Sequence, residues 1–247
     1  MKLNDHLIIP DWPAPENVRA VQTTRRGGVS GAPYDTLNLG MHVGDSALAV
    51  ERNRMRLNRL FPSEPVWLEQ VHGRMVADAD HAGCLPVADA CVARRGVCVV
   101  MTADCLPILL CDRDGTVVSA VHAGWRGLAA GVVEAAVAAM DVKAESLMAW
   151  LGPAISQAAF EVGEDVRSAF VGSDAGNESA FLEGLAGKYQ ADIYRLARRR
   201  LNLLGITQIY GGDRCTYGEP EHFFSYRRDG ATGRMGTFIW IDHSGFG

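Results

Sequence analysis

The stretch TADCLPILLCDRDGTVVSAVHAGWRG, residues Thr102 to Gly127, decides the fold. Two short apolar runs, Leu106–Cys111 and Val117–Val121, flank a turn rich in Asp and Gly. Apolar runs of this length on either side of such a turn predict a hairpin of two buried strands. Because the outer ends of an antiparallel hairpin meet, we expect Cys105 and His122 to be neighbours.

Reactive side chains gather at the outer ends of this hairpin. Asp104 precedes Cys105, small residues after His122 leave room, and a third candidate, His72, lies in EQVHG. The Ala-rich residues 123–140 that follow predict one buried helix. A single buried cysteine is usually inert core, but a thiol and imidazoles brought together beside a glycine-flanked helix start form a candidate site.

The composition is that of a globular protein without a nucleic-acid-binding surface. The chain has 247 residues, 48% hydrophobic and 21% charged, with a net charge of −5. No apolar run reaches the ~18 residues of a membrane span, and the N-terminal segment has no signal-peptide core. We therefore expect a cytoplasmic protein whose six cysteines are thiols. The sequence contains no CxxC pair, so a structural zinc ribbon is not expected.

Strand and helix patterns alternate irregularly along the chain. Strands are predicted over 18–24, 66–71, 97–102, 147–151 and 206–210, with two more strands within 223–241. Helices are predicted over 47–61, 164–171 and 192–204, and residues 172–188 are expected to be a loop with a partial helix. The pattern favours a mixed α+β domain with largely antiparallel sheets over a doubly wound parallel sheet.

Several segments, in order, resemble the laccase-domain family, once called polyphenol oxidases, which includes the YfiH-type peptidoglycan editing factors. They are TTRRGGVSGAPYDTLNLGMHVGD, VWLEQVHG, ADA, TADCLPILL, AVHAGWRG, LGPAISQAAFEVG and CTYGEPEHFFSYRRDGATGRMGTFIW. The resemblance covers nearly the whole chain and implies a single domain over residues 1–247, a layered α/β/β/α sandwich. Ala158 and Ala159 stand where some relatives carry paired cysteines, so those cysteines are not needed for the chemistry.

The resemblance also implies zinc ligands at His72, Cys105 and His122. Two imidazoles, one thiolate and an open fourth position compose a catalytic zinc site. The same residues offer a Cys105–His122 nucleophilic pair, oriented by Asp104, for cleaving an amide in a cell-wall precursor. Copper is a further alternative because His₂Cys is a blue-copper ligand set. The seven histidines form no His-x-His pair, which disfavours a multicopper oxidase.

For function, the resemblance implies purine nucleoside phosphorylase activity, with adenosine deaminase and methylthioadenosine phosphorylase as side activities. Catalysis is expected at His72, Cys105, His122 and Asp104. Phosphate needs arginines or N–H groups, and the leaving purine needs hydrogen bonds. The candidate substrate-binding residues are Arg25, Asn38, Gln70, Trp125, Arg126, Ser225 and Arg227.

Two other classes of function stay open at this stage: a Cys-dependent amidase that edits peptidoglycan precursors, and a metal-binding scaffold without turnover. The glycine-rich loop 25–31 could approach an anion through its backbone N–H groups, although it lacks the spacing of a P-loop. The expected partners are a nucleoside and phosphate, with neither nucleic acid nor membrane. The expected assembly is a monomer or a weak dimer.

Overall fold

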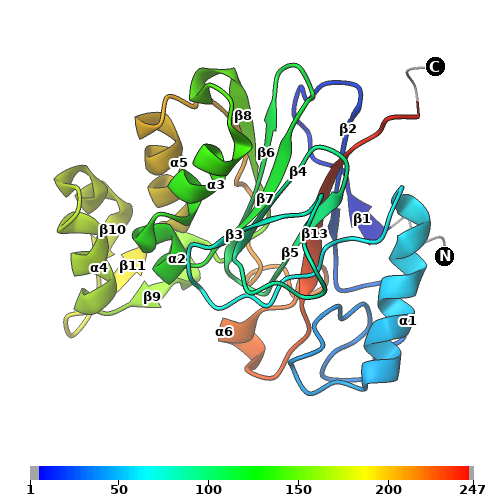
Figure 1. Cartoon of the computed structure of the whole chain (residues 1–247). Coiled ribbons are helices and arrows are strands. Elements are labelled where there is room, and N and C mark those ends of the chain that lie inside the picture. The colour runs from blue at the N-terminus through cyan, green and yellow to red at the C-terminus, as the bar shows by residue number, and fades with distance from the viewer. Residues whose placement is uncertain (1–5, 245–247) are drawn as a thin grey trace.

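Two sheets pack face to face, and helices cover their outer faces, in the part of the chain that the computed structural model describes, residues 6–244 (Figure 1). The α-helices are α1 Ala47–Leu57, α2 Trp125–Ala130, α3 Val132–Met140, α4 Glu164–Val171, α5 Ile193–Leu203 and α6 Tyr226–Asp229. The strands are β1 Leu7–Ile8, β2 Val18–Thr23, β3 Val76–Asp78, β4 Ala90–Ala93, β5 Val97–Thr102, β6 Leu106–Asp112, β7 Val118–Ala123, β8 Leu147–Leu151, β9 Glu161–Val162, β10 Phe181–Glu183, β11 Tyr189–Ala191, β12 Gln208–Gly211 and β13 Met235–Ile241.

The sheets are mixed and antiparallel, as the sequence predicts. The larger sheet has the order β12-β8-β6-β7-β4-β3, with parallel pairs at both edges and antiparallel pairs between them. The second sheet, β1-β2-β13-β5, is antiparallel throughout. A small antiparallel sheet, β10-β11-β9, lies beside α4 (Figure 1).

Three apolar layers hold the sandwich together. Side chains such as Cys98, Leu109 and Ile239 fill the space between the two large sheets. The outer face of the six-stranded sheet packs against helices α2 to α5, and the outer face of the four-stranded sheet packs against Leu57 of α1 and the ring of Trp67. The layers therefore follow the expected order of helix, sheet, sheet and helix.

The central hairpin forms as predicted. β6 and β7 are buried along their whole length, and their register pairs Pro107 with His122 and Leu106 with Ala123. This register places Cys105, directly before β6, beside the end of β7. At the other end, the buried Asp112 carboxylate accepts hydrogen bonds from Thr116 N (2.7 Å), Thr116 Oγ1 (2.7 Å) and Val117 N (3.0 Å).

Three predicted elements are wrong. The single helix over 123–140 is two helices, because Gly131 adopts a left-handed φ of 92° between α2 and α3. The strand over 66–71 is an irregular segment with isolated bridges at Val66 and Glu69. Of the two strands predicted within 223–241, one is β13, but the other is replaced by α6, whose first turn is capped by the Ser225 hydroxyl.

The remaining helix and strand predictions are confirmed with small shifts of boundary, but the expected loop 172–188 contains the strand β10 after its 3₁₀ turn, Ala175–Ala180. The helix predicted over 47–61 ends as α1 at Leu57 and continues as a 3₁₀ turn, Asn58–Leu60.

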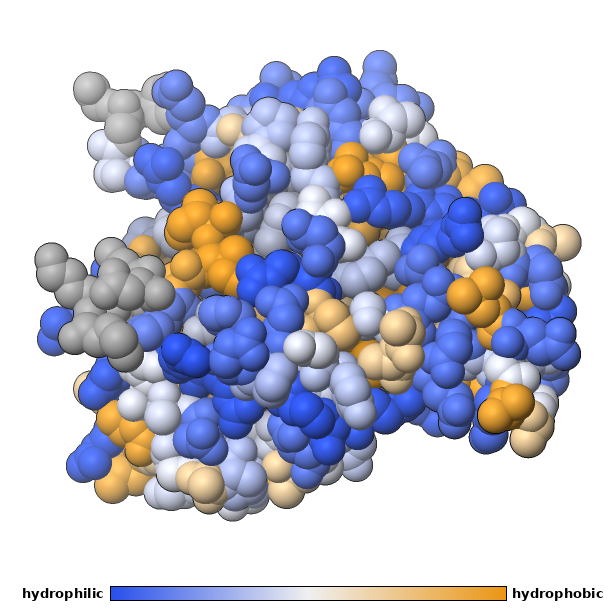
Figure 2. Space-filling view, turned by 180° about the vertical axis from the view of Figure 1, so that it is seen from behind, coloured by the Kyte–Doolittle hydropathy of each residue, from blue (hydrophilic) through white to orange (hydrophobic). Residues whose placement is uncertain are grey.

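On the face drawn in Figure 2, hydrophobic residues form small separate groups among hydrophilic ones. None of the helices within residues 6–244 is long and apolar enough to cross a bilayer.

Replacement of Asp112 by Ala should lower the free energy of unfolding by about 2–3 kcal/mol, because it leaves the buried N–H of Val117 and the partly buried N–H of Thr116 without an acceptor. Asp114→Ala, at an exposed position of the same turn, is the matched control and should change stability little. Urea denaturation of both variants measures the difference. Equal effects of the two substitutions would contradict this account of the turn.

Candidate functional site

Three metal-ligating side chains converge at the outer end of the central hairpin. The ligand atoms of His72, Cys105 and His122 all lie within 4.8 Å of one another. Cys105 Sγ is 3.9 Å from His72 Nε2, and the two imidazole rings meet edge to face with centroids 4.8 Å apart. The structure thus brings together the three residues that the sequence analysis singled out. His72 is exposed, Cys105 is half-buried and His122 is buried.

A buried carboxylate, Asp89, organises this group. Its Oδ1 lies 2.8 Å from His122 Nδ1 and accepts the backbone N–H of His72 at 2.9 Å. Its Oδ2 accepts the N–H groups of Val71 (3.2 Å) and Gly73 (2.6 Å). These bonds hold His72 at a left-handed φ of 60°, which is uncommon for a residue other than glycine. Asp89 therefore fixes the positions of both histidines.

The electrostatics of the group favour a thiolate beside an imidazolium. Burial raises the pKa of Cys105, but the charge of His122 and contacts with both imidazoles outweigh burial and lower it to about 6. Burial lowers the pKa of His122, but the charge of Cys105 and the bond to Asp89 raise it to about 9. Pairing of this kind activates a cysteine or prepares it for a metal.

Helix α2 closes the group from one side and begins at Gly124. A Cβ atom at this position would lie 2.9 Å from His72 Cδ2 and 3.1 Å from Cys105 Sγ. The first distance is shorter than real Cβ contacts and the second is tight, so any side chain at position 124 would push the ligand residues out of their present positions. Gly124 thus leaves room for the side chains of His72 and Cys105 beside the start of α2.

A cavity of about 340 Å³ opens beside the group, within the size range of small-molecule sites. Besides the three ligand residues, its wall contains His42, Gln70, Met101, Thr102, Ala103, Tyr226 and Arg234. Thr102 is almost fully buried, and its hydroxyl has no hydrogen-bond partner within residues 6–244.

Of the expected substrate-binding residues, Gln70 lines this cavity, but both ends of its amide bind the backbone of Met101, at 2.8 and 2.7 Å. Asn38 is buried and holds the backbone of Gly40 and of Arg234, each at 2.9 Å. Ser225 caps α6. These three amide and hydroxyl groups therefore position the protein chain around the site.

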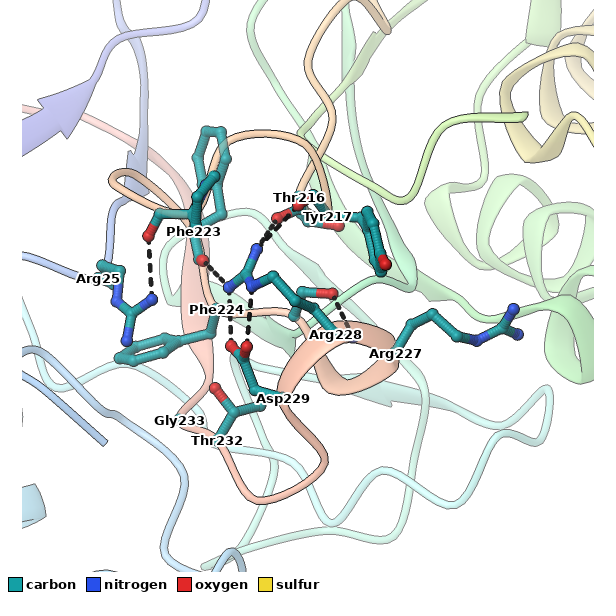
Figure 3. Close-up of polar contacts among 12 residues, drawn as sticks. Arg25, Thr216, Tyr217, Phe223, Phe224, Arg227, Arg228, Asp229, Thr232 and Gly233 are labelled. Atoms are coloured by element: carbon teal, nitrogen blue, oxygen red, sulfur yellow. Dashed lines mark hydrogen bonds and ion pairs between the residues drawn. The ribbon is translucent and has the colours of Figure 1, made fainter. Parts of the chain in front are cut away.

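The expected arginines are also engaged elsewhere. Arg25 donates to the carbonyls of Asp35 (3.0 Å) and Pro220 (2.9 Å) and lines a different cavity. Arg227 extends away from the neighbouring Arg228 (Figure 3) and donates to Glu161 O at 2.9 Å.

Arg228 itself donates to the Asp229 carboxylate and to the carbonyls of Thr216, Tyr217 and Phe223 (Figure 3). Arg126 lies over the ring of Trp125, with 4.4 Å between its guanidinium carbon and the ring centroid. Trp125 and Arg126, both on α2, are not among the residues that line the cavity.

Asp104 does not occupy the orienting position that we expected. Its carboxylate accepts from Thr216 Oγ1 and from the N–H of Arg227, both at 2.7 Å, whereas His122 is oriented by Asp89. Asp104 has a left-handed φ of 96°, and its bonds tie the chain before Cys105 to the C-terminal loops.

Sequence reasoning missed Asp89 and most of the cavity wall, including Thr102, Tyr226, His42 and Arg234. Asp89 lies within the ADA segment, and a lone acidic residue at the start of an apolar strand was the available signal. His42 and Arg234 line the cavity from segments far apart in the chain. The GMHVGD and TGRMG contexts place both between glycines, which indicates loops but gives no sign that the loops meet.

The substitution Asp89→Asn should weaken metal binding by the site about 10- to 100-fold, the usual cost of losing an orienting partner of a ligand histidine. It should also lower the free energy of unfolding by about 3 kcal/mol, because an amide cannot replace all the accepted bonds. Asp80→Asn is the matched control, since Asp80 also accepts three backbone N–H groups, from Arg94, Arg95 and Gly96. The control should lose stability yet bind metal normally in a chelator competition; loss of metal binding in both variants would contradict the role of Asp89.

Comparison with known proteins agrees with this architecture. Residues 19–242 match the family described as multi-copper polyphenol oxidoreductase laccase. A crystal structure of a Neisseria meningitidis protein superposes with a TM-score of 0.94 at 50% identity, covering 96% of this chain and 99% of that one. The Bacillus licheniformis hypothetical protein YfiH superposes with a TM-score of 0.85 at 30% identity, covering 91% and 92% of the two chains.

Curated relatives also match over nearly the whole chain. The Shigella flexneri protein named purine nucleoside phosphorylase YfiH is 56% identical over 240 residues, 95% of this chain and 98% of its own. The Escherichia coli K12 protein of the same name is 55% identical over the same shares. With a family match over most of its residues and full-length relatives above half identity, this chain belongs to the multi-copper polyphenol oxidoreductase laccase family, the laccase-domain family to which YfiH proteins belong.

Proposed function

We propose that this protein is a purine nucleoside phosphorylase that acts in the cavity beside His72, Cys105 and His122. The observation that carries the proposal is that relatives at about 55% identity over 95% of the chain are named for this activity, and the geometry supports it. The cavity is large enough for a small molecule and combines a His–Cys–His group with a guanidinium, that of Arg234, and a buried unpartnered hydroxyl, that of Thr102.

The reaction transfers the ribosyl group from a purine to phosphate. A phosphate oxygen forms a bond to C1′ as the bond between C1′ and N9 breaks, and the electron pair of that bond stays with the purine. Hydrogen phosphate gives up its proton, and the purine accepts one. The products are the free base and ribose 1-phosphate, so the reaction needs no oxidant, reductant or water.

The residues of the cavity meet distinct demands of this reaction. Arg234 supplies positive charge for the phosphate, which must approach C1′ without being repelled. Thr102 lines the cavity, and no protein group within residues 6–244 satisfies its buried hydroxyl, so a rotation of this side chain would let it bond to a polar atom of the nucleoside. Gln70 and Asp89 do not touch the substrate in this proposal; they fix the segment that carries His72.

The ligand residues fit zinc. A tetrahedral zinc ion with bonds of about 2.0–2.3 Å holds its ligand atoms roughly 3.5 Å apart, close to the 3.9 Å between Cys105 Sγ and His72 Nε2. The bond between His122 Nδ1 and Asp89 leaves Nε2 for a metal, the usual arrangement of carboxylate, histidine and zinc. When bound, zinc would supply a Lewis acid that polarises a substrate atom.

The ligand groups disfavour a multicopper oxidase, because such an enzyme needs many histidines in one cluster. Within residues 6–244, two groups of side chains have metal-ligand spacing, His72–Cys105–His122 and Glu219–Glu221–His222. Neither group contains more than two histidines, so neither resembles a trinuclear copper site.

Phosphate-dependent release of base from adenosine, inosine and guanosine tests the function. Cys105→Ala should lower kcat/KM by about 100-fold or more, as loss of a group at the reacting centre does. Cys84→Ala, at an exposed cysteine, is the matched control and should keep full activity. Base release that does not require phosphate, or that survives in Cys105→Ala, would refute phosphorolysis at this site; loss of activity after metal removal, restored by zinc, would establish the metal.

Gly124→Ala should lower the affinity for zinc by about 10-fold or more, because the added methyl group displaces the ligand atoms by tenths of an ångström. Gly83→Ala is the control, since a Cβ at position 83 meets no atom within 4 Å. Competition with a chromogenic chelator measures both affinities. An unchanged affinity in Gly124→Ala would show that the close contact is not part of the metal site.

A further inference from the structure

Two neighbouring cavities share one wall. The inner cavity, of about 340 Å³, contains the His–Cys–His group. A second cavity of about 440 Å³, here called the outer cavity, is lined by Val43 and the loop 230–232. His42, Tyr226 and Arg234 line both cavities. A group bound in the outer cavity would therefore lie beside three of the side chains that also line the inner cavity.

Arg234 in this shared wall has donors to spare. Its Nη1 donates to the carbonyls of Thr232 and Gly233, both at 3.0 Å. Within residues 6–244 it forms no ion pair, and its Nε and Nη2 make no hydrogen bond. A half-buried guanidinium that keeps its charge without a carboxylate is costly unless a bound anion compensates it.

The protein holds this arginine firmly in place. Asn38 accepts the backbone N–H of Arg234 at 2.9 Å. The aliphatic stem passes over Gly40, where a Cβ would lie 2.9 Å from Arg234 Cγ. The guanidinium carbon lies 6.0 Å from the centre of the Tyr226 ring. Such support is typical of a binding residue whose position matters.

Thr232 is an independent sign of a ligand in the outer cavity. Its side chain is 1% exposed, and its hydroxyl has no hydrogen-bond partner within residues 6–244. Buried hydroxyls in folded proteins are normally satisfied by protein, water or ligand. Thr232 lines the outer cavity, and a rotation of its side chain would turn the buried hydroxyl toward a polar molecule bound there.

The charge of the outer cavity favours an anion, because the Cys105 thiolate lines only the inner cavity. Burial lowers the pKa of His42, and the positive charges of Arg234 and Arg54 lower it further, so positive charge accumulates here. Among the described residues that line either cavity, none is an Asp or a Glu. A tetrahedral oxyanion offers several acceptor atoms, which suits a guanidinium, an imidazole and a hydroxyl together.

We propose that the outer cavity binds inorganic phosphate through Arg234, His42 and Thr232, and that the nucleoside binds in the inner cavity with its C1′ toward His42, Tyr226 and Arg234, the residues that line both cavities, so that a phosphate oxygen reaches C1′ directly. The identity of the anion rests on the proposed function. Binding of an oxyanion by these residues does not, so the two ideas can fail separately.

The test measures phosphate binding and turnover in Arg234→Met and Thr232→Val. Arg234→Met should raise the KM for phosphate about 30-fold and Thr232→Val about 10-fold, the usual range for hydrogen bonds to a charged ligand. The KM for the nucleoside should change less than about 3-fold in Thr232→Val, because Thr232 lines only the outer cavity. Calorimetric titration of the full-length protein with inorganic phosphate, without nucleoside, should show the same order of affinities.

Arg198→Met is the matched control. Arg198 is also half-buried and also donates to two carbonyls, those of Ile209 (3.2 Å) and Gly211 (2.6 Å), but it lies on α5. It should leave the KM for phosphate unchanged. If Thr232→Val binds phosphate like the wild type, the outer subsite is refuted even where Arg234→Met binds it weakly. If phosphate binds with the expected order but no nucleoside is turned over, the subsite stands and the proposed function fails.

Discussion

The structure of the site depends on one buried carboxylate. Asp89 accepts three consecutive backbone N–H groups from the segment that carries His72 and bonds to the ring of His122 on β7. Without it, the irregular segment that carries His72 would be held to the sheets only by isolated bridges and by the bonds of the Gln70 amide to Met101 of β5. One charged group therefore couples a loop to the central sheet, and the ligand geometry follows from that coupling.

The parts of the fold that could be predicted are those in which local pattern and tertiary environment agree. β5, β6 and β8 are short apolar runs buried on both faces, so their composition alone identifies them. The errors have physical causes. Gly131 ends α2 inside an Ala-rich run that hides it, and in FFSYRRDG the aromatic residues favour a strand while Ser225 caps a helical turn.

The His–Cys–His group could be predicted because two of its members lie at the ends of one hairpin, where chain geometry brings them together. The rest of the cavity could not, because His42 and Arg234 come from loops that meet only in the folded chain. Arginines were the least predictable residues. The sequence shows the charge of an arginine but not the partners of its N–H donors. The guanidinium groups of Arg25 and Arg227 donate to carbonyls away from the site, whereas Arg234 keeps free donors beside the cavity.

The place of β13 has a consequence for the order in which the chain assembles on the ribosome. This strand, the last one described, lies in the middle of the four-stranded sheet between β2 and β5. Until residues 235–241 have left the exit tunnel, both of its neighbours present unpaired edges, which are prone to pair with other chains. A nascent chain can thus complete its central hairpin early, yet the sandwich closes only once β13 has emerged and paired with β2 and β5, and Arg234, which directly precedes β13, emerges just before it.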